Sequence, residues 1–122
     1  MKLTIRTDGF EGARKRSLER AAKIDRGERI ARSRTITFES PLEMLEVLTA
    51  ERMRLFEVAK TQAFSVTGLA AALGRDPKSV RRDVLKLVRV GVLRTREEIN
   101  PGHGRVKIVE PVAQRVEMRA SF

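Results

Sequence analysis

Basic and aliphatic side chains are interleaved between Pro77 and Val90 at the spacing of one helix. The aliphatic residues recur at i, i+4, i+7 and i+8, the positions of a single buried face, and they are Val80, Val84, Leu87 and Val88. Helical geometry leaves the outer and lateral faces to the basic residues, which are Lys78, Arg81, Arg82, Lys86 and Arg89. An arginine guanidinium can donate to both O6 and N7 of guanine, so the spacing predicts a helix that reads base edges in a DNA major groove.

The polar residues of this helix are assigned different contacts. Residues predicted to reach base edges are Lys78, Arg81 and Arg82, and residues predicted to contact phosphates are Ser79 and Lys86. Arg75 lies in the preceding turn, beside the first amides of the helix, which also favour a phosphate. The competing interpretation is a solvated surface. Asp83 is the one acid between Lys78 and Arg89, and this excess of positive charge favours DNA contact.

A shorter helix is expected directly before this one. Thr67 can cap its start and Gly74 can end it, and most residues between them are small, which permits close approach of another helix. After a tight turn, Asp76 can cap the next helix and Pro77 suits its first position. The segment therefore predicts a helix-turn-helix, in which the first helix braces the second.

A β-hairpin is expected after Gly91. Val92 to Arg96 and Arg105 to Val109 are strand-like, and Glu97 to Gly104 between them contains a strong turn signal. Basic side chains on its flanks and tip would contact the DNA backbone or minor groove, and they are Arg94, Arg96, Arg105, Lys107 and, at the tip, His103. For His103 the alternative is a turn residue chosen for its conformation.

The first 40 residues predict a strand, a helix and a second strand. Lys2 to Thr7 and Arg34 to Glu39 both alternate between apolar and polar residues. Between them, a thin apolar stripe at helical spacing precedes a stop at Gly27, and its residues are Phe10, Ala13, Leu18, Ala21 and Ile24. Beyond Pro111, apolar residues recur at even positions, which predicts a terminal strand.

Two further helices are expected in the middle of the chain. Ser40 can cap the first, Pro41 suits its first position and Glu43 can return a capping-box bond. Its expected apolar face consists of Leu42, Leu45 and Leu48. The second begins after a cap at Thr49 and runs to about Lys60, and its expected buried stripe is Met53, Phe56 and Val58 or Ala59.

Composition restricts the function further. The 122 residues include 26 basic and 16 acidic residues, for a net charge of +10, which predicts a polyanionic partner. Residues 1–34 hold 11 basic and 5 acidic residues, residues 35–74 hold 3 and 5, and residues 75–122 hold 12 and 6, so the middle is expected to be scaffold.

Several classes of chemistry are disfavoured. The chain has no cysteine and one histidine, which argues against thiol, zinc and Ser-His or Cys-His chemistry. Glu39, Glu43 and Glu46 are more simply complements of a helix dipole than metal ligands. With no Tyr or Trp, stacking platforms for RNA or single strands are lacking. We expect no enzyme, no cofactor, no metal and no membrane contact.

The stretch from Phe38 to Val109 resembles a prokaryotic winged helix-turn-helix regulator, broadly similar to the MarR and ArsR superfamily. The resemblance rests on "LTAERMRLFEVAK", "SVTGLAAALGRDPKSVRRDVLKLVRVGVL" and "GRVKIVEP", and it is strongest to small predicted regulators, some of them antitoxin-like. It implies a homodimer that binds double-stranded DNA and represses a promoter. The Cys and His ligands of metal-sensing members are missing, so no effector is implied.

The sequence thus predicts an α+β protein with three parts. Residues 1–38 are a basic extension for dimerisation or partner binding, residues 39–111 a winged helix-turn-helix domain, and residues 112–122 a strand or tail. The expected function is a sequence-specific DNA-binding repressor, located in the cytoplasm with the nucleoid. The alternative is an antitoxin whose N-terminal region binds a toxin and whose winged helix autoregulates its operon.

Overall fold

The computed structural model describes residues 1–121, which divide into two compact units. The first consists of residues 1–47 together with the chain from Arg115 onward, and the second of Leu48–Gln114. The described residues form five helices and two three-stranded sheets, so the expected α+β class is confirmed. The division differs from the expected boundaries after residues 38 and 111, because the helix after Ser40 and the last strand both join the first unit.

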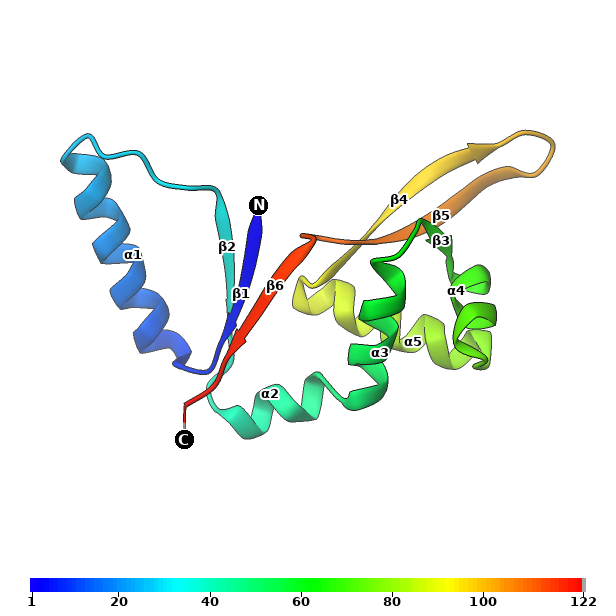
Figure 1. Cartoon of the computed structure of the whole chain (residues 1–122), viewed down its shortest axis with the longest axis horizontal. Helices are drawn as coiled ribbons and strands as arrows, with labels where there is room; N and C mark the ends of the chain where they lie inside the picture. The colour runs from blue at the N-terminus through cyan, green and yellow to red at the C-terminus, as the bar shows by residue number, and fades with distance from the viewer. Residues whose placement is uncertain (122) are drawn as a thin grey trace. The chain divides into compact units, whose positions relative to one another are not determined.

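The first unit is built on a parallel sheet with the N-terminal strand at its centre. The order is β2-β1-β6, formed by β1 (Lys2–Arg6), β2 (Ser33–Thr37) and β6 (Arg115–Arg119). α1 (Gly9–Asp25) carries the chain from the end of β1 back to the start of β2 (Figure 1). The predicted strand-helix-strand order and terminal strand are therefore present.

The apolar stripe predicted on α1 is not buried. Phe10, Leu18 and Ile24 are each more than half exposed, and Gly9 is the only fully buried residue of the helix. The stripe stays exposed because α1 turns polar side chains such as Ser17 and Arg20 towards the sheet.

The helix α2 (Pro41–Val47) is capped as predicted but buries a different residue. Ser40 Oγ accepts a hydrogen bond from the Glu43 amide at 3.1 Å, and the Glu43 carboxylate accepts one from the Glu39 amide at 2.7 Å. Leu42 and Leu45 are exposed and Met44 is buried, whereas Leu48, just beyond the helix, is buried as predicted. Spacing alone did not reveal which side of this short helix faces the protein.

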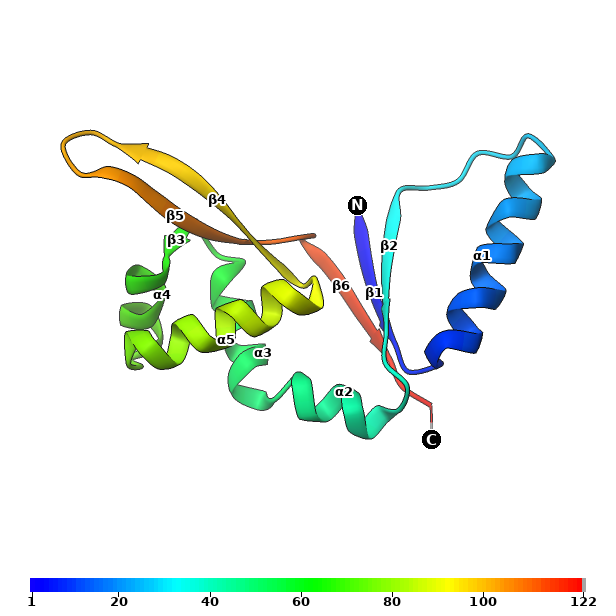
Figure 2. The ribbon, with the colours of Figure 1, turned by 180° about the vertical axis from the view of Figure 1, so that it is seen from behind.

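The second unit places three helices beside an antiparallel sheet. Its elements in chain order are α3 (Ala50–Ala59), β3 (Phe64–Ser65), α4 (Val66–Leu73), α5 (Pro77–Val90), β4 (Leu93–Asn100) and β5 (Gly104–Pro111). The sheet order is β3-β5-β4 (Figure 2). Its fully buried large side chains come from every helix and from the hairpin, and they are Leu55, Leu69, Val80, Val84, Leu87, Leu93 and Val109.

The helix boundaries follow from local capping, with one correction. Thr49 and Asp76 cap α3 and α5 as predicted. Ser65 caps α4 by accepting a hydrogen bond from the Gly68 amide at 3.0 Å, so the prediction of Thr67 was wrong. Ser65 has the extended backbone of an N-cap because it ends β3, a strand too short to be recognised from sequence. Gly74 ends α4 in a left-handed conformation that favours glycine.

No helix in the part of the chain that the structure describes is both long and apolar enough to span a bilayer.

Candidate nucleic-acid interface

The helix α5 has one buried aliphatic face and one exposed basic face. Val80, Val84 and Leu87 are buried as predicted, and Val88 is half-buried at the margin of that face. The exposed basic side chains are Lys78, Arg81, Arg82 and Arg89, with Lys86 half-exposed. Among the described residues none of these five forms an ion pair with a carboxylate. The face therefore offers uncompensated positive charge to a partner.

The start of α5 is firmly defined. Asp76 accepts a hydrogen bond from the Ser79 amide at 3.3 Å, and Pro77 occupies the first turn, where its missing amide hydrogen costs nothing. Gly91 ends the helix with a positive φ of 103°, which directs the chain into β4. Because both ends are capped, the basic residues between them are held in one helical register.

A buried carboxylate anchors the inner side of α5. Asp83 accepts hydrogen bonds from Arg52 Nε at 3.1 Å and from Arg75 Nη2 at 2.7 Å. It thereby joins α5 to α3 and to the turn after α4. Its position three residues after Val80 and four before Leu87, on the buried face, was the available signal.

The ionisation of Asp83 is stabilised by these two arginines. Burial alone would raise the pKa of this carboxyl, but the hydrogen bonds and charges of Arg75 and Arg52 outweigh that effect and hold the pKa below its ordinary value. The acid within the basic helix is therefore neutralised inside the protein and contributes little negative charge to the exposed face.

Two residues expected at the interface are engaged inside the protein instead. Arg75 Nη2 donates to Ser79 Oγ at 2.7 Å as well as to Asp83, and both Arg75 and Ser79 are half-buried. Lys78, Arg81 and Arg82 are brought together on one exposed face, with Lys86 at its edge.

The hairpin is longer than the sequence predicted. The segment from Glu97 to Asn100, expected in the turn, continues β4, and the turn is reduced to residues 101–103. The pairing extends to Asn100 opposite Gly104. Beyond the helices both strands are exposed, and Ile99 is 76% exposed. The distal hairpin extends past α3, α4 and α5 in both views (Figures 1 and 2).

Most basic side chains of the hairpin face a glutamate. Glu110 accepts hydrogen bonds from Arg96 Nε at 3.1 Å and Arg94 Nε at 2.8 Å, and Arg105 pairs with Glu97 at 3.2 Å. The hydrogen bond from Arg96 is the main reason that the pKa of Glu110 lies below its ordinary value. Lys107 and His103 are exposed and have no ion-pair partner among the described residues.

Among the described residues, no group of three or more His, Cys, Asp and Glu side chains is arranged to hold a metal ion.

The second unit thus combines a short helix, a turn, a helix with an exposed basic face and an antiparallel hairpin within one small α+β domain. The family model HVO_A0114 matches residues 47–115, more than half of the chain, and the chain belongs to the HVO_A0114 family.

The other comparisons are sparse. No curated protein matches the chain. Among solved structures, it is similar to a protein of Methanosarcina mazei Go1 described as a "possible transcriptional regulator". The sequence identity is 19%, the match covers 58% of this chain and 67% of that one, and the TM-score is 0.48.

Proposed function

We propose that this protein is a sequence-specific, double-stranded DNA-binding transcriptional regulator that acts as a repressor. In this proposal the second unit is a winged helix-turn-helix domain, with α5 in the major groove and the β4–β5 hairpin as the wing. The observation that carries the proposal is the division of α5 into a buried aliphatic face and an exposed basic face without ion pairs. A helix on which the one acid is turned inward presents a single sign of charge to phosphates and base edges.

The wing has a different task in this proposal. Because Arg94, Arg96 and Arg105 already pair with glutamates, their net attraction for phosphate is reduced. His103 at the tip and Lys107 on β5 have no such partners among the described residues, and they are the residues best able to contact the backbone or minor groove. These contacts would add affinity for any duplex rather than sequence choice.

The protein is proposed to bind as a homodimer. Two-fold symmetry would place two copies of α5 in successive major grooves of a palindromic site. Residues 1–38 can supply an interface, since Phe10, Leu18 and Ile24 of α1 are exposed. Sedimentation of the protein on a selected duplex should then show two protomers for each site.

Selection of duplexes from a random library, followed by affinity measurement, tests the proposal. The selected duplex should bind far more tightly than a scrambled one at the same salt concentration. Replacing both Arg81 and Arg82 by Ala should weaken specific binding by about 1 to 3 kcal/mol for each bidentate base contact that is lost.

The matched control is Arg54→Ala, which removes the same charge from an exposed position on α3. It should change specific binding much less than either arginine of α5. If no preferred duplex emerged, or if Arg54→Ala weakened binding as much as Arg82→Ala, α5 would not be the reading element.

A further inference from the structure

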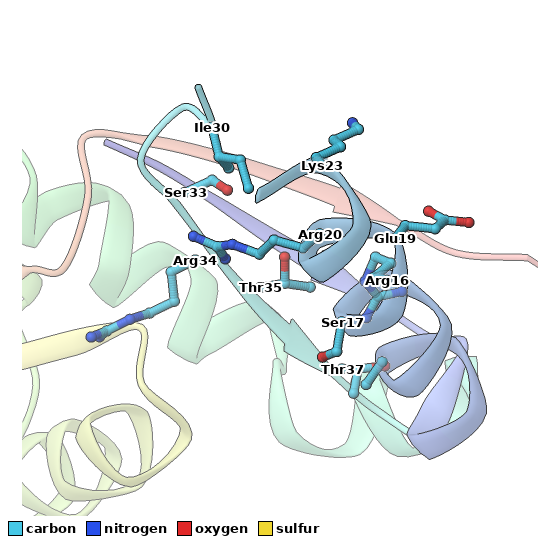
Figure 3. A pocket seen from close by; sticks show the side chains of 11 residues that line it. Arg16, Ser17, Glu19, Arg20, Lys23, Ile30, Ser33, Arg34, Thr35 and Thr37 are labelled. Carbon is cyan, nitrogen blue, oxygen red and sulfur yellow. The ribbon is translucent and has the colours of Figure 1, made fainter. Parts of the chain in front are cut away.

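A cavity of about 510 Å³ lies between α1 and β2 within the first unit (Figure 3). This volume falls in the range of about 300–1,000 Å³ that is usual for small-molecule sites. The side chains that matter are Arg16, Ser17 and Arg20 from α1 and Ser33, Thr35 and Thr37 from β2. A helix that connects parallel strands ordinarily buries apolar side chains against the sheet. Here hydroxyl and guanidinium groups face each other instead.

The hydroxyl groups that β2 contributes to the cavity belong to one face of the sheet, whereas Ala13 and Ile30 add apolar surface to the lining. Residues that align across parallel strands share a face, and the β1 residues aligned with Ser33, Thr35 and Thr37 are Lys2, Thr4 and Arg6. The apolar residues of β1, Leu3 and Ile5, alternate with these and belong to the opposite face, where they are fully buried. The polarity of the β2 side of the cavity therefore follows from strand register.

One arginine of the cavity is held in place and another is unpaired. Arg16 forms an ion pair with Asp8, and the same carboxylate accepts a hydrogen bond from Thr37 Oγ1 at 2.8 Å. Arg20 extends from α1 towards Ser33 on β2 (Figure 3), and it has no ion-pair partner in the chain from residue 1 to residue 121. Lys23 stands at the rim and points outward. An unpaired guanidinium beside several hydroxyl donors matches the oxygens of a phosphate group.

We propose that this cavity binds a small organic phosphate, with Arg20 as the principal anion contact and Ser17, Ser33 and Thr35 as hydroxyl donors. Glu19 and Arg34 also border the cavity, but their side chains point away from the space between α1 and β2 (Figure 3). A DNA duplex carries the same phosphate chemistry, so the test below includes a duplex as a competing occupant. The proposal concerns the first unit and is independent of DNA binding by the second.

The test titrates the full chain with inorganic pyrophosphate as the probe. Binding is monitored by the amide NMR spectrum of the protein at constant ionic strength. Pyrophosphate should saturably shift the resonances of Ser17, Arg20, Ser33 and Thr35. Arg20→Gln should weaken this binding about tenfold or more, the loss of a charge-assisted hydrogen bond. Arg14→Gln removes the same charge from an exposed position of α1 outside the cavity, and it should leave the affinity within about twofold.

Three outcomes would overturn the proposal. Shifts that never saturate, or equal weakening by Arg14→Gln and Arg20→Gln, would mean attraction by net charge alone. Shifts of the same four residues by a short DNA duplex, with competition against pyrophosphate, would make this face a DNA contact. If the α5 variants lose duplex binding but still bind pyrophosphate, the DNA-binding proposal for the second unit and the phosphate proposal for the first unit are tested separately.

Discussion

At the scale of single residues, the role of an acid depends on which way its helix is turned. In the sequence Asp83 is a lone negative charge that weakens an otherwise basic segment. In the structure it is buried between Arg52 and Arg75 and thereby anchors α5 to two other parts of the second unit. The exposed face of α5 thus carries uncompensated basic residues, together with the exposed Leu85, because its acid has an internal function.

Asp83→Asn should destabilise the second unit. A neutral amide cannot compensate the positive charges of the half-buried Arg52 and Arg75. We therefore expect the free energy of unfolding to fall by about 2 kcal/mol at pH 7. The pKa of Asp83 is lower in the folded protein than its ordinary value of 3.8. Its contribution is therefore complete above that value and is lost as the pH falls through the lower folded pKa.

Urea unfolding of both proteins at pH 7 and near pH 3 measures this effect. The difference between wild type and Asp83→Asn should shrink at the lower pH. A difference that stayed constant with pH would assign the loss to packing rather than to the ionised carboxylate.

At the scale of elements, the hairpin shows that ion pairs with glutamates reduce the charge that its basic residues offer to a partner. Arg94 and Arg96 both lie within hydrogen-bond distance of Glu110, which lies on β5 opposite Arg94 and diagonally from Arg96. Arg105 similarly faces Glu97. Exposed ion pairs of this kind stabilise little, but they lower the net charge that the hairpin presents. Its affinity for a polyanion is therefore governed by its glutamates as well as its arginines.

Glu110→Gln should strengthen binding to every duplex alike. The substitution leaves Arg94 and Arg96 without their common carboxylate, so the logarithm of affinity should fall more steeply with the logarithm of salt concentration. Measurement on the selected and a scrambled duplex, with Glu57→Gln of α3 as the exposed control, tests this expectation. Unchanged affinity for both duplexes would remove the inner hairpin from the interface.

Lys107→Gln should act in the opposite direction. Loss of one phosphate contact should reduce the magnitude of the salt slope by about 1 and weaken specific and scrambled duplexes equally. Binding isotherms at several salt concentrations check this. A loss confined to the selected duplex would contradict a backbone role for the hairpin and indicate base reading instead.

At the scale of the whole molecule, the chain leaves the first unit and returns to it. β1 is the central strand of the first sheet and pairs with β2 on one side and with β6 on the other. Residues 48–114 of the second unit lie between these contributions in sequence. The first strand, β1, and the last strand, β6, are thus hydrogen-bonded in parallel, and the sheet of the first unit needs both of them.

Ending the chain at Gln114 should therefore affect the first unit selectively. Without β6, the strand β1 loses one of its two partners, and amides of residues 2–6 should exchange faster with solvent. Amides in α3, α4 and α5 should retain their protection. Hydrogen exchange followed by NMR checks this, and equal acceleration in both units would show that they do not behave as separate compact units.

Much of this protein was predictable from local sequence. Capping residues predicted the starts of α3 and α5, Gly91 predicted the end of α5, and the valine and leucine spacing of α5 predicted its buried face, because these signals act within one or two helical turns. The charge pattern predicted the basic face for the same reason. The antiparallel hairpin was also predicted, since its turn residues lie between its strands.

Other features depend on contacts between residues distant in sequence, which only the tertiary structure decided. The burial of Asp83 needs Arg52, which lies 31 residues earlier, and the polar face beneath α1 needs the parallel register of β1 and β2. The exposure of Leu42 and Leu45 likewise depends on which side of α2 meets other elements. Periodicity specifies that a helix has two faces, whereas the packing of the folded chain determines which face is inside and which charges remain unpaired.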